Sequence, residues 1–207
     1  MTLPIRVAIR FLLISVFIAM VLHWYGDSLL ELLLPIYRWE INFIDAGYQV
    51  RSFSINNSEP EHVFFLQVNL AKPMFVGGRF IFPNPQGLAQ ASSIVDHVWL
   101  MAVLFFAIIF SWPASRMRLL VLRVLVGLPF LIGILLLDIP FTLLAALKGL
   151  IIQQLELDTF SPLILWGSFL EGGGRLALSL VAGALVVLVT NFLFNNRSII
   201  VANNSAS

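Results

Sequence analysis

The chain contains no cysteine and few charged residues, and both shortages narrow what it can be. Without cysteine it cannot form a disulfide, hold an iron–sulfur cluster, build a Cys-ligated zinc site or attack a substrate with a thiol. Charged residues make up 11% of the 207 residues, whereas a soluble domain carries about a quarter. The formal net charge of +1 also argues against a basic surface for nucleic acid, so we expect no nucleic-acid partner.

Hydrophobic residues are correspondingly abundant, at 59% of the chain with a mean hydropathy of +0.95, which indicates an integral membrane protein in contact with the lipid bilayer. We expect one membrane domain, residues 1–207, with four transmembrane helices. Their predicted bounds are about 7–25, 94–112, 119–138 and 176–194. The first run ends in His23-Trp24-Tyr25 and lacks a small-residue cleavage site, so it predicts a retained span and not a signal peptide.

The basic residues predict the topology. Six of them flank one set of span ends in segments without Asp or Glu: Arg6, Arg10, Arg116, Arg118, Arg123 and Arg197. The positive-inside rule then places the N and C termini in the cytoplasm of a bacterial inner membrane. A six-span alternative would leave Glu156 and Asp158 cytoplasmic, which this charge distribution opposes.

The predicted outer segment 26–93 contains more than a loop. Polar residues recur at helical spacing through 29–46, which predicts an amphipathic surface helix bent at Pro35. Strands are expected at 48–55, 62–70 and 75–82, the first two forming a β-hairpin. So small a sheet is marginal in water, and either the surface helix or a partner protein must cover it.

The second outer segment, 139–175, is apolar but interrupted. Pro140 is expected to end or kink the third span, with short interfacial helices following it. Whether residues 140–170 are re-entrant or interfacial stays open. The predicted fold class is an all-α membrane protein with four transmembrane helices, a small extracytoplasmic β-hairpin and amphipathic surface helices.

Two histidines are candidates for cofactor binding. His23 and His97 stand near the outer ends of the first two spans, where facing imidazoles are able to ligate haem b or line a quinone pocket. Interfacial histidines without a cofactor are commoner, so we expect no cofactor and no metal. Asp96 fits the start of a helix, with Ser92 or Ser93 as its N-cap.

Asp138 is the most informative single residue, because a carboxylate within an apolar span requires a partner. We expect a structural ion pair between Asp138 and Arg175; Lys148 or a residue of another subunit is the alternative. The small side chains Ser179 and Gly183 follow Arg175 on one face of the last span, and they predict close packing with another helix.

The order of these parts is similar to a known family. A first span, an outer hairpin with Phe64–Leu70, an Arg-rich turn at Arg116–Arg123 and a late Trp166-Gly167 resemble the small membrane proteins that accompany exosortase-type sorting systems in Gram-negative bacteria. The resemblance implies an accessory role and transfers no active-site residues. The sorting enzymes themselves use a membrane-embedded cysteine, which this chain lacks.

The expected function is therefore that of an accessory or scaffold subunit in a larger inner-membrane complex, with other membrane protein subunits as partners. The candidate residues do not converge on a nucleophile, a base and an orienting group, so we expect no catalytic activity. The alternatives are a redox anchor using His23 and His97, a small transporter, and a membrane hydrolase using Asp96, His97 or Glu171.

Overall fold

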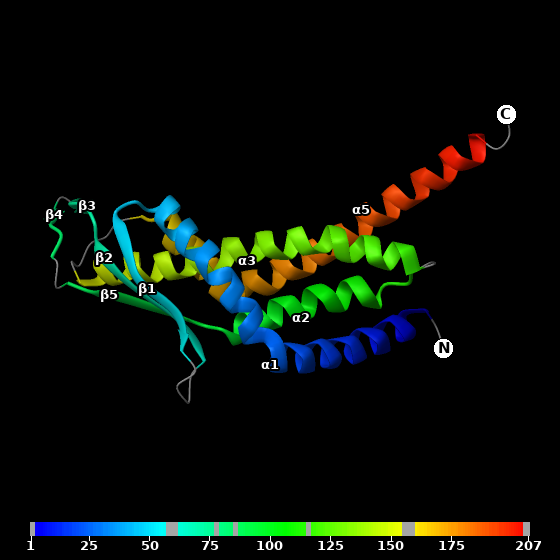
Figure 1. Cartoon of the computed structure of the whole chain (residues 1–207), viewed down its shortest axis with the longest axis horizontal. Coiled ribbons are helices and arrows are strands. Elements are labelled where there is room, and N and C mark those ends of the chain that lie inside the picture. Colours follow the sequence, from blue (N-terminus) through cyan, green and yellow to red (C-terminus); the bar gives the residue numbers. More distant parts are fainter. Residues whose placement is uncertain are drawn as a thin grey trace. The chain divides into compact units, whose positions relative to one another are not determined.

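The computed structural model describes residues 3–56, 62–76, 79–84, 87–114, 117–154 and 160–204. The chain is mostly helical, with three long apolar helices and a small antiparallel sheet (Figure 1). Where one domain is predicted, the chain forms two compact units. Unit 1 is Met1–Leu22, Trp99–Ile134 and Leu176–Ser207, and unit 2 is His23–Val98 and Leu135–Arg175.

Three helical stretches have the length and apolar character that a membrane span needs. They are Ile5–Ile44, Met117–Gln153 and Pro162–Phe194. The predicted span 94–112 corresponds to helix α2, Asp96–Ser111, whose 16 residues extend about 24 Å at 1.5 Å per residue. This length falls short of a hydrocarbon core of about 30 Å, so α2 is a shorter apolar helix.

The first helix does not stop where the sequence analysis expects. Helix α1 runs unbroken over Leu3–Ile44, so the predicted span 7–25 and the predicted surface helix 29–46 are one element. Pro35 lies inside it. A helix tolerates Gly26 at a cost of about 1 kcal/mol and proline at about 3 kcal/mol, and the apolar residues on both sides favour its continuation.

Helix α3, Met117–Gln154, likewise continues through Pro140, where an end or a kink is predicted. Phe141 to Gln154 therefore extends the third helix and forms no separate interfacial helix. A short helix α4, Pro162–Phe169, does occur in the same segment. It leads through a π-helical turn, η1 (Leu170–Gly174), into helix α5, Arg175–Asn204.

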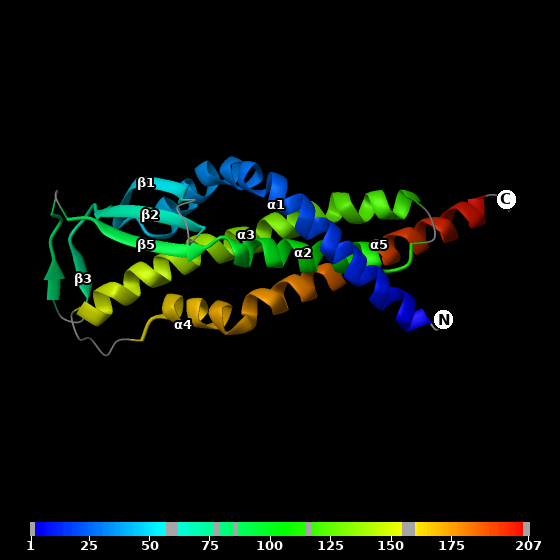
Figure 2. The ribbon, with the colours of Figure 1, turned by 90° about the horizontal axis from the view of Figure 1, so that it is seen from below.

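Unit 2 contains the sheet. Strands β1 (Tyr48–Asn56) and β2 (Val63–Leu70) confirm the predicted hairpin, and a third strand, β5 (Ala89–Ile94), pairs antiparallel with β2. Figure 2 shows the three strands side by side in the order β1-β2-β5. The predicted strand 75–82 is instead two short strands, β3 (Met74–Val76) and β4 (Arg79–Ile81), which pair with each other.

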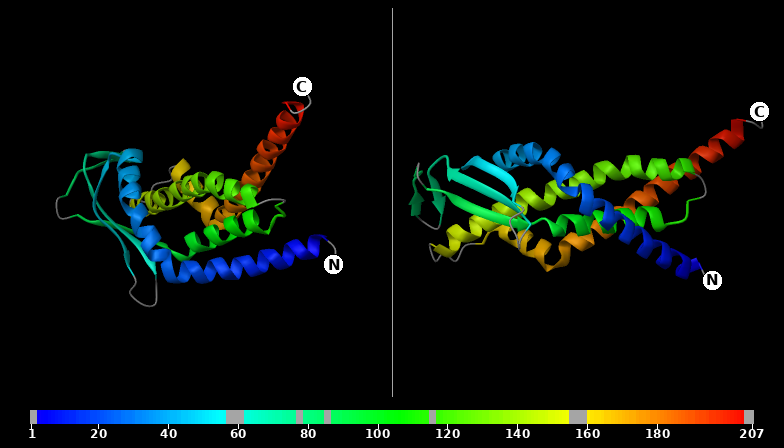
Figure 3. Two further views of the ribbon diagram at one scale, coloured as in Figure 1. Left: turned by 45° about the vertical axis from the view of Figure 1, so that its right-hand side comes forward. Right: turned by 60° about the horizontal axis from the view of Figure 1, so that its bottom comes forward.

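The second half of α1 covers one face of this sheet, as Figure 3 shows. The ring centroid of Tyr37 lies 6.3 Å from those of Phe53 and Phe64, and Tyr37, Ile41, Phe64 and Leu66 are fully buried. Arg38 Nη2 donates a 3.3 Å hydrogen bond to the carbonyl oxygen of Val50 in edge strand β1. The amphipathic part of α1 thus supplies the cover that the small sheet requires.

Candidate functional site

The predicted ion pair is present in a buried polar cluster of unit 2. Arg175 Nε donates a 2.7 Å hydrogen bond to Asp138 Oδ1. Thr142, one helical turn beyond Asp138 on α3, donates to the same oxygen at 3.2 Å and accepts from Arg175 Nη2 at 3.1 Å. All three side chains are buried, and the hydrogen bonds among them offset the cost of removing their polar groups from water.

The glycine-rich turn before α5 positions Arg175. Gly173 has a φ of +104°, which a residue with a Cβ rarely adopts, and a Cβ on Gly174 would lie 2.5 Å from the Phe169 ring. The run Gly172-Gly173-Gly174 therefore permits the π-helical turn and brings Arg175 to Asp138.

Tyr37 extends this cluster, and the sequence analysis assigned it no such part. Its side chain is completely buried, its hydroxyl makes no hydrogen bond within the described residues, and it lies within electrostatic range of Asp138 and Glu40. His97 is also within electrostatic range of Asp138. The cluster joins α1, α3 and the start of α5 inside unit 2, and its polar contacts are those of a structural core.

The two histidine candidates are not joined to each other. His23 and His97 are both exposed, and His23 contacts the neighbouring Trp24 ring edge-on, with 6.4 Å between ring centroids. In the described part of the chain no hydrogen bond or ring contact joins the two histidines, and no group of three potential metal ligands occurs. Cofactor binding by this pair stays a prediction.

Asp96 is the first residue of α2, as expected of a carboxylate that complements the positive end of the helix dipole. Ser92 and Ser93, expected as N-caps, lie instead in strand β5 opposite Phe65 and Phe64. His62 Nε2, directly before β2, lies 3.2 Å from Asp27 Oδ1 on α1.

The small residues of the last helix do pack against another helix, and it belongs to the same chain. A Cβ on Gly183 would lie 3.2 Å from Ile108 Cβ and 3.3 Å from the Phe105 carbonyl oxygen, both on α2. Ser179 and Thr190 on the same helix are fully buried. This side of α5 is consequently occupied by α2 within unit 1.

Arg123 has a structural role that the sequence analysis missed, since it counted this residue as a flanking charge. Its buried guanidinium donates to the carbonyl oxygens of Ile109 and Trp112 at 3.2 and 2.8 Å and to that of Pro113 at 3.2 Å. It also donates to Asn191 Oδ1 at 3.1 Å. The last carbonyls of a helix lack partners, so the break at Trp112-Pro113 is a signal for a nearby donor.

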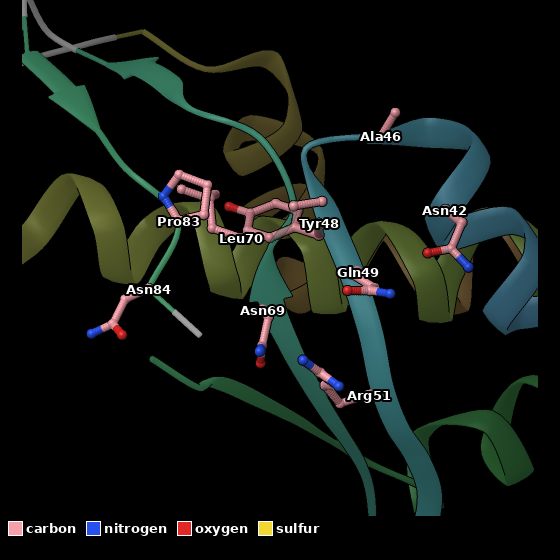
Figure 4. Close-up of a pocket in the computed structure, with 10 residues that line it drawn as sticks. Asn42, Ala46, Tyr48, Gln49, Arg51, Asn69, Leu70, Pro83 and Asn84 are labelled. Carbon is pink, nitrogen blue, oxygen red and sulfur yellow. The ribbon is translucent and has the colours of Figure 1, made fainter. Parts of the chain in front are cut away.

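A hollow in unit 2 has a volume of about 540 Å³ and is lined by four side-chain amides, one arginine and five further residues, Ala46, Tyr48, Leu70, Ala71 and Pro83. Residues from the end of α1, from β1 and β2 and from the segment after β4 form its walls (Figure 4). No family model, no curated protein and no solved structure matches the chain.

Proposed function

We propose that the chain is a non-catalytic accessory subunit of a larger complex in the bacterial inner membrane. The observation that carries this proposal is the uncovered state of α1. None of the most apolar window of this helix is buried within the chain, whereas a third of the corresponding window is buried in each of the other two long helices. Leu12, Leu13 and Phe17 each expose more than 60% of their surface.

The buried charges support the same proposal. Asp138 and Arg175 bind each other, and Arg123 binds the carbonyls at the end of α2. Charged groups inside membrane segments commonly mark ion pathways or catalysis, but here their hydrogen bonds fasten helices together. These buried charges therefore have a structural role, as expected of a scaffold subunit.

An exposed aromatic group supplies a second contact surface. Phe75 and Phe80, on β3 and β4, have ring centroids 4.9 Å apart, and Phe82 stacks on Phe80 at 6.4 Å. All three side chains are more than 60% exposed. Clustered exposed aromatics are typical of protein interfaces, which fits contact between this part of the chain and the outer portion of a partner subunit.

The proposed topology has four spans with both termini in the cytoplasm. In this topology α2 crosses the membrane in addition to the three long helices. The N–H groups of the Arg123 guanidinium satisfy the carbonyls at its end, as an apolar environment requires. With the N terminus in the cytoplasm, the single crossing of α1 puts the sheet of unit 2, which follows it, in the periplasm. The five-strand segment between α1 and α2 then lies entirely on that side.

Site-specific photo-crosslinking in native membranes tests the proposal. A photoreactive amino acid at Phe17 of α1 is compared with one at Leu188 of α5, because their exposed fractions, 66% and 65%, are matched. We expect protein adducts from Phe17 and only lipid adducts from Leu188. An absence of protein adducts at both positions contradicts the accessory role.

Absorption spectroscopy and quinone extraction distinguish the redox-anchor alternative from the accessory role. The accessory role predicts that the purified protein has no Soret band and that extraction yields no bound quinone. A Soret band that disappears in His23→Ala and in His97→Ala, with protein partners retained, would favour a haem anchor over a pure scaffold.

A further inference from the structure

We propose that the hollow in unit 2 binds a ligand that carries one negative charge flanked by hydroxyl groups, the chemistry shared by a sugar acid and a phosphatidylglycerol headgroup. The hollow is bounded by the end of α1, by β1 and β2, and by Pro83 and Asn84 after β4. Its volume of about 540 Å³ falls within the range of small-ligand sites in proteins. The accessory role does not assign any function to this hollow.

The charge of the lining selects an anion. Arg51 is the single charged residue among the lining residues, which include no Asp, Glu or Lys. In the described part of the chain Arg51 forms no ion pair. A guanidinium without a carboxylate partner keeps its full charge for an incoming anion.

The neighbouring amide orients this guanidinium without neutralising it. Asn69, opposite Gln49 on the adjacent strand, is buried. Its amide is assigned with the oxygen toward Arg51, because this orientation accepts hydrogen bonds from Nε and Nη2, each at 3.2 Å. Figure 4 shows Arg51 and Asn69 side by side. The Nη1 group of the Arg51 guanidinium then faces a carboxylate oxygen of the proposed ligand.

The other polar residues of the lining suit hydroxyl groups, beside the apolar Leu70, Ala71 and Pro83. Besides Asn69, which binds Arg51, three lining residues carry primary amides, which both donate and accept hydrogen bonds: Asn42, Gln49 and Asn84. Tyr48 is 5% exposed, and its hydroxyl makes no hydrogen bond within the described residues. Neighbouring sugar hydroxyls also combine donor and acceptor, so an amide lining complements them.

A singly charged ligand is favoured over a phosphate dianion. One arginine supplies all the positive charge, and the lining residues Asn42 and Ala46 stand at the carboxyl end of α1, where the helix dipole is negative. A carboxylate and a phosphodiester both carry one charge. The shared chemistry is therefore a monoanion with adjacent hydroxyls, and its possible sources are a soluble sugar acid and the headgroup of phosphatidylglycerol.

The test measures binding to the full chain in phosphatidylcholine nanodiscs by calorimetry. Glucuronic acid is compared with glucose, which lacks only the carboxylate function. We expect saturable binding of glucuronic acid and a much weaker response to glucose. Equal binding of the two sugars, or no binding of glucuronic acid, overturns the proposal. Saturable competition of glucuronic acid by phosphatidylglycerol in the nanodisc would identify the lipid headgroup as the source.

Variants locate the site. Arg51→Gln removes the charge and should weaken binding by about 10-fold or more, the effect of losing a charge-assisted hydrogen bond. Lys72→Gln removes an exposed cation outside the lining and serves as the matched control. Gln49→Ala, which keeps Arg51, provides an independent variant if Arg51→Gln fails to fold. Undiminished binding in Gln49→Ala and a correctly folded Arg51 variant excludes this hollow.

Discussion

Replacing Asp138 and Arg175 by alanine, singly and together, tests the buried ion pair of unit 2. Their side chains are 1% and 7% exposed, so removal of either one leaves the other as an uncompensated buried charge. Such a loss costs about 3–5 kcal/mol in proteins, and we expect each single variant to lose about that much free energy of unfolding. The double variant buries no lone charge, so its loss should be smaller than the sum by up to about 3 kcal/mol.

The assay is denaturant unfolding in one detergent, followed by far-ultraviolet circular dichroism. Thr142→Val removes the two hydrogen bonds of the hydroxyl and leaves both charges paired, so it should cost only about 1 kcal/mol per bond. Glu171→Ala removes an exposed carboxylate four residues before Arg175 and should be close to neutral. Strictly additive losses in the double variant would refute the mutual compensation of Asp138 and Arg175.

Three further predictions concern packing, titration and topology. Gly183→Leu should reduce the stability of the isolated protein by about 1–3 kcal/mol, because the new Cβ would lie within 3.3 Å of atoms of α2. Gly133→Leu should not, because its Cβ would have no atom within 4 Å. Thermal unfolding checks both variants. Burial, together with the nearby Asp45 carboxylate, raises the pKa of Tyr48 from 10.0 to about 12. The unfolded chain therefore deprotonates first, stability should fall as the pH rises from 10 to 12, and Tyr48→Phe should reduce this fall in a stability-against-pH measurement. Cysteines replacing Ser58, Ser115 and Ser205, which lie outside the described residues, should react with an impermeant maleimide in intact spheroplasts only at Ser58; labelling at Ser115 alone would reverse the topology.

The sequence predicted the elements that have strong hydrophobic periodicity and failed at their boundaries. Strands β1 and β2 carry alternating large apolar residues, and their predicted ranges agree with the structure to within one residue at each end. Pro35 was predicted to bend the surface helix and Pro140 to end or kink the third span, but each removes one backbone hydrogen bond from a helix that continues on both sides. A rule that treats proline as a helix breaker does not compare the loss of one backbone hydrogen bond with the stability of the long helix on both sides.

Strand β5 was missed for a different reason. Its sequence, Ala89-Gln90-Ala91-Ser92-Ser93-Ile94, contains one β-branched residue and no aromatic one, so its intrinsic strand preference is weak. The strand forms because β2 offers it a free edge, with Leu66 opposite Ala91 and Val63 opposite Ile94. This pairing joins residues that are 21 to 31 positions apart in the sequence, and no local sequence pattern indicates it.

The ion pair was predictable because a lone carboxylate in an apolar span demands a partner and few cations were available. Tyr37 and Thr142 were not singled out, since neutral polar residues carry no comparable penalty and leave no mark on the hydropathy. The amide-lined hollow was equally invisible. Its residues come from α1, β1, β2 and the segment after β4, and only the tertiary fold brings them together.

Arg123 shows how one residue can satisfy two different rules, and its role bears on the topology. The charge count treats it as one of six cytoplasmic markers, but its guanidinium is buried on the carbonyls of Ile109, Trp112 and Pro113. A buried structural arginine is not a marker of the side on which a loop lies, so Arg123 is left out of the count of basic residues. The five remaining residues, Arg6, Arg10, Arg116, Arg118 and Arg197, still lie in segments without acidic residues. The proposed cytoplasmic termini therefore do not depend on Arg123, and its replacement should alter the stability of unit 1 without inverting the protein in the membrane.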